Sequence, residues 1–289
     1  MESHQHESRH RHGAVGEIDS AATVELLDLD AEVLHSYLSD VVAWVHDMAT
    51  DPPYRRILDL GCGTGSGALA LTRRFGAADV IAVDMSAPLL ARLSEKARDL
   101  GLVNRIRTVE ADLDGVWPTI DTVDLAWASN SLHHMSDPDR VLVDVFATIR
   151  PGGLLAVAEM ESFPRFLPDD IGLGRPGVEA RCHAAAAEAL AHDLPHLGDD
   201  WGTRLRRAGF TIESQRTFTI DLPRPLPAAT GRYAQASLRR IRTGLDGRLS
   251  AEDLATLDIL VDSDGTDGVL RRDDLTVRAA RTAWVARRP

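Results

Sequence analysis

The clearest chemical signal in the sequence is a glycine-rich turn. Residues 57–71 read ILDLGCGTGSGALAL, an apolar run that contains Asp59 and then turns through four glycines in seven positions. Residues 63–68 (GTGSGA) satisfy the G-x-G-x-x-G/A pattern of dinucleotide sites, although that pattern is weak by itself. Asp59 favours another ligand, because its carboxylate repels a pyrophosphate and forms an ion pair with an ammonium group. The turn therefore suits a nucleoside that also carries a cationic amine.

Two more acids follow the next two predicted strands. Asp84 comes directly after the run VIAV, 23 positions beyond Gly61, where a carboxylate can accept hydrogen bonds from both ribose hydroxyls. Asp112, in EADLDG, follows the third strand and can accept from the exocyclic amine of adenine, with Leu113 covering the ring. Both positions support a nucleoside ligand.

Five stretches form an ordered set over residues 55–160, namely ILDLGCGTG, VIAVDMS, VEADLDG, VDLAWASNSLHHMSDP and IRPGGLLAVAE. In this order and spacing they resemble the successive motifs of class I S-adenosylmethionine-dependent methyltransferases. The later stretch WGTRLRRAGFTIES continues the similarity. The first 50 residues and two insertions show no match of comparable specificity.

The resemblance implies a fold and a cofactor. The fold is α/β, a doubly wound Rossmann-like sheet of seven strands, mostly parallel with the last strand antiparallel. The cofactor is S-adenosylmethionine, the product is S-adenosylhomocysteine, and no metal ion is expected. In this family the turn approaches the methionine portion of the cofactor, and the residues after the next strands approach the ribose, the adenine and the sulfonium. The cofactor-binding residues are then Asp59, Gly61, Cys62, Gly63, Thr64, Gly65, Asp84, Met85, Asp112, Leu113, Ser129 and Asn130.

Three side chains at the ends of the fourth and fifth predicted strands are candidates for catalysis. Methyl transfer from a sulfonium is an in-line displacement, so the protein has to align a nucleophile and, where needed, remove its proton. The candidates are His134, His133 and Glu159, with His134 slightly ahead of His133 as a general base. Leu-His-His before Asp-Pro is common in this family whatever the substrate, so a packing role for one ring stays open. Cys62 is interpreted as a small residue of the turn, not as a nucleophile.

These residues require a sheet whose strands end at a common edge. Short β-branched runs alternate with helical stretches over residues 56–159, which predicts crossover connections and a parallel sheet. Helices are predicted at 66–75, 86–100, 137–149 and 199–208, and Ser86 and Asp137 are the expected N-caps of the second and third. Strands are predicted at 56–60, 79–83, 105–109, 123–128, 153–159, 210–221 and 274–287.

The remaining segments predict a single domain with a helical cap. Residues 1–19 are polar and histidine-rich, which indicates a disordered arm more than a metal-binding tract. Residues 20–289 are expected to form one methyltransferase domain, with a core at 55–160, 198–221 and 274–289. The cap is expected from residues 20–50, 161–197 and 223–272, over the carboxyl edge where open α/β sheets bind ligands.

Composition limits the partners. The 289 residues carry a formal charge of −12 and a single lysine, Lys96, which argues against nucleic acid. Two cysteines favour a reducing compartment, and the absence of a long apolar stretch argues against a membrane span, so we expect a cytoplasmic protein. A homodimer stays open.

The predicted function is methyl transfer to a small-molecule acceptor. O-methylation in bacterial natural product biosynthesis is the first hypothesis, and C-methylation of a quinone ring is the second. A third is a non-methylating enzyme, for example a cyclase, or a binding protein that retains the cofactor.

Overall fold

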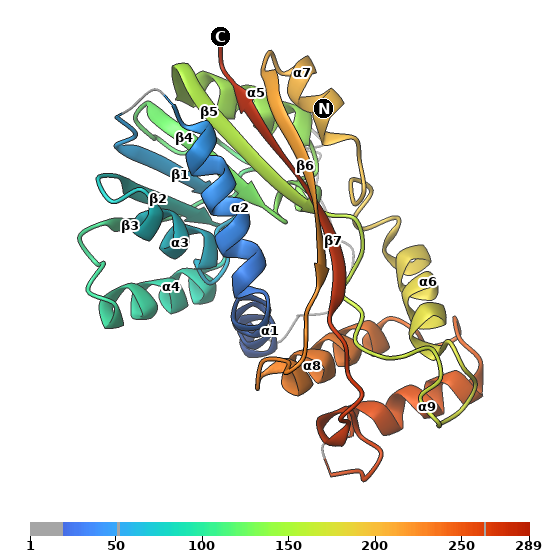
Figure 1. Ribbon diagram of the computed structural model, residues 1–289. Coiled ribbons are helices and arrows are strands. Elements are labelled where there is room, and N and C mark those ends of the chain that lie inside the picture. The colour runs from blue at the N-terminus through green and yellow to red at the C-terminus, as the bar shows by residue number, and fades with distance from the viewer. Residues whose placement is uncertain (1–19, 51–52, 263) are drawn as a thin grey trace, which may run out of the picture.

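A computed structural model describes residues 20–50, 53–262 and 264–289, and its centre is a seven-stranded sheet of order β3-β2-β1-β4-β5-β7-β6 (Figure 1). Strand β7 runs antiparallel to both of its neighbours, whereas the pairs from β3 to β5 are parallel. The predicted fold class is therefore confirmed. The strands are β1 Arg56–Leu60, β2 Asp79–Asp84, β3 Ile106–Glu110, β4 Val123–Ser129, β5 Ile149–Met160, β6 Thr211–Asp221 and β7 Arg278–Arg287.

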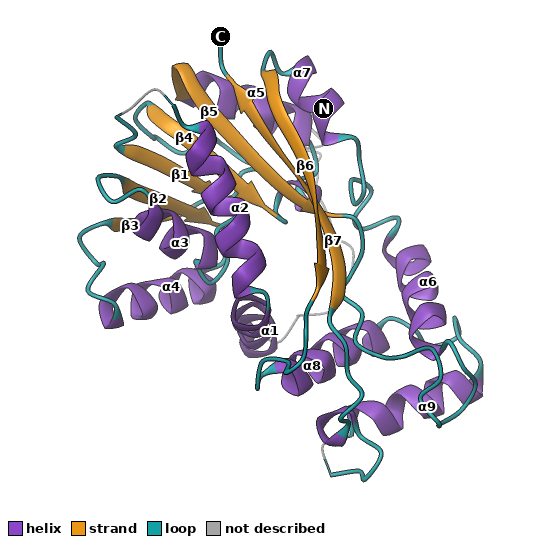
Figure 2. Ribbon diagram, in the orientation of Figure 1, coloured by secondary structure: helices purple, strands orange, loops and turns teal. Residues whose placement is uncertain are grey.

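Helices cover both faces of the sheet (Figure 2). One hydrophobic cluster joins α2, α3 and α4 to one face, and a second joins α5 and α7 to the other. Alternate residues of β1 enter different clusters, because successive side chains of a strand point to opposite faces. The helices are α1 Ser20–Val33, α2 His35–Met48, α3 Ser66–Arg74, α4 Ala87–Asp99, α5 Pro138–Thr148, α6 Val178–Leu190, α7 Trp201–Arg207, α8 Thr230–Thr243 and α9 Ala251–Val261, with 3-10 turns η1 Leu132–His134 and η2 Val269–Arg271.

The two predicted N-caps behave differently. Asp137 caps α5, since its carboxylate accepts the N–H of Arg140 at 3.0 Å. Ser86 occupies the N-cap position of α4, but its side chain makes no capping hydrogen bond. Its backbone N–H instead donates to Asp84, so the start of α4 is tied to the end of β2.

Two strand boundaries differ from the prediction by four residues, and the other strand ends agree with it to within one residue. Strand β5 begins at Ile149, four residues early, because the chain pairs with β4 before it passes through Pro151 and the positive-φ Gly152. Strand β7 begins at Arg278, four residues late, because its partner β6 ends opposite at Asp221. The alternating apolar pattern continues before Arg278, where the backbone bonds to the loop at Phe166.

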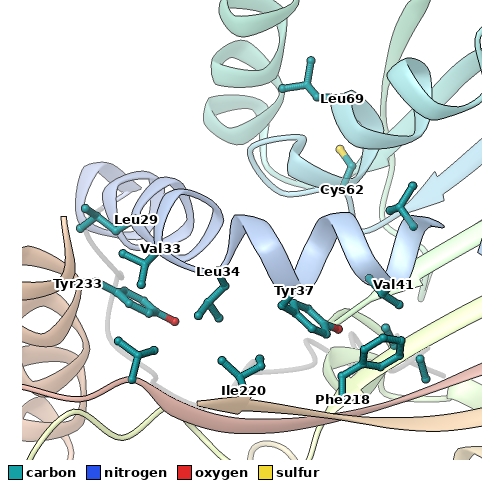
Figure 3. Packing of buried hydrophobic residues seen from close by; sticks show 14 of the residues in the cluster. Leu29, Val33, Leu34, Tyr37, Val41, Cys62, Leu69, Phe218, Ile220 and Tyr233 are labelled. Carbon is teal, nitrogen blue, oxygen red and sulfur yellow. The ribbon is translucent and has the colours of Figure 1, made fainter. Parts of the chain in front are cut away.

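The first and later helices meet beyond the carboxyl ends of the parallel strands (Figure 1). Helix α1 contacts α8, and α8 contacts α6 and α9. Figure 3 shows side chains of α1 and α2 packed against β6 and α8, among them Leu29, Leu34, Tyr37, Phe218 and Tyr233. The N-terminal helices therefore share a hydrophobic cluster with the later segments. The arm predicted for residues 1–19 lies outside the described residues.

Candidate active site

The glycine-rich turn joins β1 to α3 and leaves no room for side chains at two glycines. Gly61 and Gly65 have φ angles of 62° and 82°, in the left-handed region that favours glycine. A Cβ on Gly61 would lie 2.6 Å from the Cβ of Ser131, and a Cβ on Gly65 would lie 2.1 Å from the Cδ1 of Leu93. The turn is thus fixed between the loop after β4 and helix α4.

Asp59, near the end of β1, is buried, and within the described part of the chain its Oδ2 has no hydrogen-bond partner. A Cβ on Gly67 would lie 3.1 Å from this oxygen, so α3 passes close to it. Burial raises the pKa of Asp59 to about 7; the Ala68 N–H lowers the pKa, and the charge of Asp84 raises it further. A buried acceptor without a donor is costly, and a ligand ammonium would offset that cost.

Asp84, the last residue of β2, holds the turn in place. Its Oδ2 accepts the N–H of Gly63 at 2.8 Å, and its Oδ1 accepts the N–H of Ser86 at 2.9 Å. Each carboxylate oxygen has two lone pairs, so both oxygens retain acceptor capacity for a ribose hydroxyl. The adjacent Met85 is 65% exposed and offers an apolar side chain to a ligand ring.

The end of β3 lies at the same edge of the sheet. The N–H of Ala111 donates to the carbonyl of Asp84 at 3.0 Å, which ties the two strand ends together. Asp112 is exposed, and its Oδ1 accepts the N–H of Asp114 at 2.9 Å. Leu113 is buried in the core. Asp112 and Met85 are therefore the accessible groups here, whereas Leu113 belongs to a hydrophobic core cluster.

One buried carboxylate from β5 holds the loop after β4. Oε1 of Glu159 accepts the N–H groups of Ser131 at 3.1 Å and Leu132 at 2.9 Å, and its Oε2 lies 2.5 Å from Nδ1 of His133. Since a carboxylate accepts, Nδ1 donates and Nε2 of the neutral ring is the acceptor. Among the described residues that Nε2 has no hydrogen-bond partner. The His133–Glu159 pair is thus arranged as a histidine base oriented by a carboxylate.

His134 differs from its neighbour. Its ring lies 4.2 Å from the His133 ring, centroid to centroid, but its side chain is exposed. Its pKa is lowered to about 4, first because surrounding protein removes part of its hydration and then because the nearby His133 and Arg240 disfavour a positive charge on the His134 ring. At neutral pH the ring is therefore uncharged and weakly basic.

The histidine loop touches the glycine turn. Besides the close approach of Ser131 to Gly61, the Ser131 Oγ donates to the carbonyl of Leu60 at 2.8 Å. Asn130, between this serine and β4, has a φ of 51°, and its Oδ1 is buried without a partner in the described chain. The strand ends of β1, β4 and β5 therefore bring together the His133–Glu159 pair, the Asn130 amide and the glycine turn.

Comparison with known proteins decides what this arrangement belongs to. A family described as "Methyltransferase domain" matches residues 57–153, the span that holds the turn, both acids after β2 and β3, and the histidine loop. The matched segment and the similar proteins support the class I S-adenosylmethionine-dependent methyltransferase family that the sequence motifs resemble. The strand order and the antiparallel β7 agree with the fold that the sequence motifs imply for this family.

Individual relatives match over part of their length. Methyltransferase GfsG of Streptomyces halstedii is 34% identical over 157 residues, which are 54% of this chain and 53% of that protein. A demethylmenaquinone methyltransferase of Thermus thermophilus is 34% identical over 125 residues, or 41% of this chain and 53% of that protein. The matched segment spans about half the length of each of these two relatives.

Solved structures share the fold over more of the chain. A methyltransferase candidate of Bacillus halodurans superposes with a TM-score of 0.56 at 17% identity, covering 86% of this chain and 98% of that one. The [4+2]-cyclase SpnF superposes with a TM-score of 0.51 at 23% identity, covering 87% and 80%. At these identities the likeness concerns the fold alone.

One contact of this candidate site was not predicted from the sequence. Nζ of Lys96, on α4, donates to the carbonyl of Thr64 in the turn at 3.1 Å and pairs with Asp28 of α1. Asp28 also accepts from Arg92 at 2.8 Å, and a Cβ on Gly63 would lie 3.3 Å from Leu27 of α1. The Asp28–Lys96 pair, called the latch below, thus holds helix α1 against the turn. The only sequence signal was the spacing of Arg92 and Lys96 on one helix face.

The structure brings together two sets of the predicted site residues. The structure brings the turn, Asp59 and Asp84 together, and it joins His133 to Glu159. It places Cys62 in the turn as a buried thiol whose pKa is raised by burial and by the nearby acids, which does not suit a nucleophile. Ser129 ends β4 as a strand residue paired with Ala158. The cofactor and catalytic roles of these residues stay predictions.

Proposed function

We propose that this protein binds S-adenosylmethionine and transfers its methyl group to a small-molecule acceptor. The observation that carries the proposal is the contact between the histidine loop and the glycine turn, through Ser131 and Gly61. That contact places the base-bearing loop beside the site expected for the cofactor. When bound, the cofactor supplies an activated methyl group on a sulfonium.

The residues of the turn fit this cofactor. The partnerless oxygen of Asp59 suits the ammonium of the methionine portion, and the remaining acceptor sites of Asp84 suit the ribose hydroxyls. The accessible Met85 and Asp112 suit an adenine, one by apolar contact and the other by accepting from its amine. Ser129, the last residue of β4, and Asn130, which follows it, are proposed for the sulfonium side of the cofactor.

His133 is proposed as the general base, with Glu159 as its positioning partner. The carboxylate fixes Nδ1–H, so Nε2 is free to accept the proton of an acceptor hydroxyl. His134 has a pKa near 4, which makes it the weaker base at neutral pH. A hydroxyl acceptor, and therefore O-methylation, follows from this assignment. A bacterial natural product stays the first hypothesis for the acceptor.

Two other reactions are alternatives to O-methylation. The demethylmenaquinone methyltransferase relative favours C-methylation of a quinone-like ring, and the cyclase of the same fold shows why a non-methylating reaction has to be tested. Incubating the protein with carbon-13-methyl S-adenosylmethionine and a panel of phenols, alcohols and quinols separates the three. A methoxy signal supports the proposal, a C-methyl signal supports the first alternative, and turnover without S-adenosylhomocysteine release supports the second.

The raised pKa of Asp59 predicts pH-dependent cofactor affinity. Binding an ammonium requires the carboxylate, so affinity for S-adenosylhomocysteine is expected to rise between about pH 6 and pH 8, with proton release on binding. The stability of the unliganded protein has the opposite pH dependence. Asp59 keeps its proton up to about pH 7 in the folded state, whereas it loses the proton near pH 4 in the unfolded chain. The contribution of this proton to the free energy of unfolding is therefore lost as pH rises through 7.

Titration calorimetry in buffers of different ionisation enthalpy measures the proton release, and chemical denaturation at several pH values measures the stability. The variant Asp59→Asn is the control, because an amide does not titrate. It is expected to bind more weakly and to lose both slopes. Wild-type affinity that is flat across this range contradicts the assignment of Asp59 to the ammonium.

The latch at Lys96 predicts a second effect on cofactor binding. Lys96→Met removes both the hydrogen bond from Lys96 to the Thr64 carbonyl and the ion pair with Asp28, so α1 and the turn are held together by fewer contacts. We expect about tenfold weaker binding of S-adenosylhomocysteine, or ~1.4 kcal/mol, with faster dissociation. Arg92→Met is the matched control, since it breaks a pairing with Asp28 and leaves the turn untouched. Equal effects of both substitutions contradict a role in holding the turn.

A further inference from the structure

Trp127, on β4, carries a buried hydrogen-bond donor. The residue is 1% exposed, and its indole Nε1 has no hydrogen-bond partner within the described part of the chain. A buried donor without an acceptor costs free energy, and the large majority of such groups in folded proteins are paired. The group therefore calls for an acceptor close to β4.

The partnerless oxygen of Asp59 lies beside this donor. Asp59 and Trp127 are partners in the parallel ladder of β1 and β4, and partners in neighbouring strands carry their side chains on the same face of a sheet. That face is the one covered by α3, because Trp127, Ile57 and residues of α3 belong to one hydrophobic cluster. A buried donor and a buried acceptor, each without a partner among the described residues, are thus neighbours.

Gly67 of α3 shows how closely the two groups approach each other. A Cβ on this glycine would lie 2.8 Å from Nε1 of Trp127 and 3.1 Å from Oδ2 of Asp59. Both atoms therefore surround a single point next to α3, and the glycine keeps that point clear of a side chain. A rotation of the Asp59 carboxyl group is enough to join donor and acceptor.

The other groups around Asp59 leave its carboxylate with little support. Burial raises the pKa of Asp59 to about 7; the Ala68 N–H of α3 lowers the pKa, and the charge of Asp84 at the end of β2 raises it further. Cys62, in the turn, adds only a neutral thiol, since burial and these same acids raise its pKa. A second N–H donor, from β4, would favour the carboxylate that an ammonium ligand needs.

We propose that the indole N–H of Trp127 donates to the Asp59 carboxylate in the cofactor-bound state, so that Trp127 is a positioning residue for the ligand ammonium. This inference rests on the proposed function and adds a residue to its cofactor site. Ionisation makes the Asp59 oxygens stronger acceptors, and the hydrogen bond forms as the proton leaves. Each carboxylate oxygen has two lone pairs, so Oδ2 can accept the indole N–H and an ammonium together.

The first test needs no cofactor. The full chain is labelled with nitrogen-15 at the tryptophan indoles, and the Nε1–H signal of Trp127 is identified by its loss in Trp127→Phe. If that variant does not fold, phenylalanine substitutions of the other tryptophans identify the signal by elimination. The signal is expected to move to lower field as pH rises through about 7, and to stay in place in Asp59→Asn. A signal that does not titrate, or that titrates equally in Asp59→Asn, overturns the proposal.

The second test measures the affinity for S-adenosylhomocysteine by titration calorimetry between about pH 6 and pH 9. Trp127→Phe keeps an aromatic ring and removes the donor, so the midpoint of the rise in affinity is expected to move up by about one pH unit. Binding should then be about tenfold weaker than in the wild type at pH 6 and nearly equal at pH 9. A loss that is the same at every pH indicates a packing defect and contradicts the proposal.

Trp201→Phe is the matched control. Trp201 is also 1% exposed with an Nε1 that lacks a described partner, but it belongs to the cluster on the other face of the sheet. The variant is expected to keep the wild-type midpoint, and an equal shift in both variants contradicts the proposal. If the cofactor does not bind at all, the proposed function fails, while the indole titration still decides whether Trp127 donates to Asp59.

Discussion

Replacing His133 with alanine is expected to lower the turnover of methyl transfer by about 10²- to 10⁴-fold, the usual contribution of a positioned general base. The reason is geometric: His133 is the histidine whose Nδ1 is held by Glu159, so its Nε2 is oriented to accept a proton. The dissociation constant of S-adenosylhomocysteine should change little. Steady-state kinetics and calorimetry on the same preparation separate the two effects.

His134→Ala is the matched control, because the two rings are adjacent and only one has a carboxylate partner. With a pKa near 4, His134 is expected to contribute less than tenfold. Unchanged turnover in His133→Ala, or a larger loss in His134→Ala, assigns the base elsewhere.

The parallel half of the fold could be predicted from local sequence because its signals are local. The buried run at Ile57 and Leu58, the glycines after it and the Asp137–Pro138 helix start are each recognisable within a few residues. Boundaries failed where pairing depends on a distant partner. The start of β7 is set by the end of β6 at Asp221, and no residue near Arg278 encodes that.

The grouping of the candidate site residues could also be predicted from local sequence, whereas contacts between residues far apart in the chain could not. Strand order brings carboxyl ends to one edge, so Asp59, Asp84 and the histidines could be grouped from the alternation of strands and helices. The choice between His133 and His134 could not be made, because it depends on Glu159, 26 residues away in sequence. The latch at Asp28 and Lys96 spans 68 residues and is likewise invisible locally.

The buried pair of Arg281 and Asp30 gives the largest expected effect on stability. Arg281 is almost fully buried in β7, pairs with Asp30 of α1 at 2.8 Å, and lies over the ring of Tyr37 at 5.0 Å. Arg281→Met leaves the Asp30 carboxylate without its cation in a partly buried site. The free energy of unfolding is expected to fall by about 3–5 kcal/mol, measured by urea denaturation.

Arg232 and Glu25 provide a matched control, because this exposed pair joins the same two helices that Asp30 and Tyr233 join, α1 and α8. Arg232→Met is expected to lower the free energy of unfolding far less than Arg281→Met, since solvent screens the exposed pair. The double variant Arg281→Met with Asp30→Leu should be more stable than Arg281→Met alone, because it removes the unpaired charge. If the two arginine substitutions cost the same, the docking of α1 depends on apolar packing around Leu29 and Leu34 and not on the buried charges.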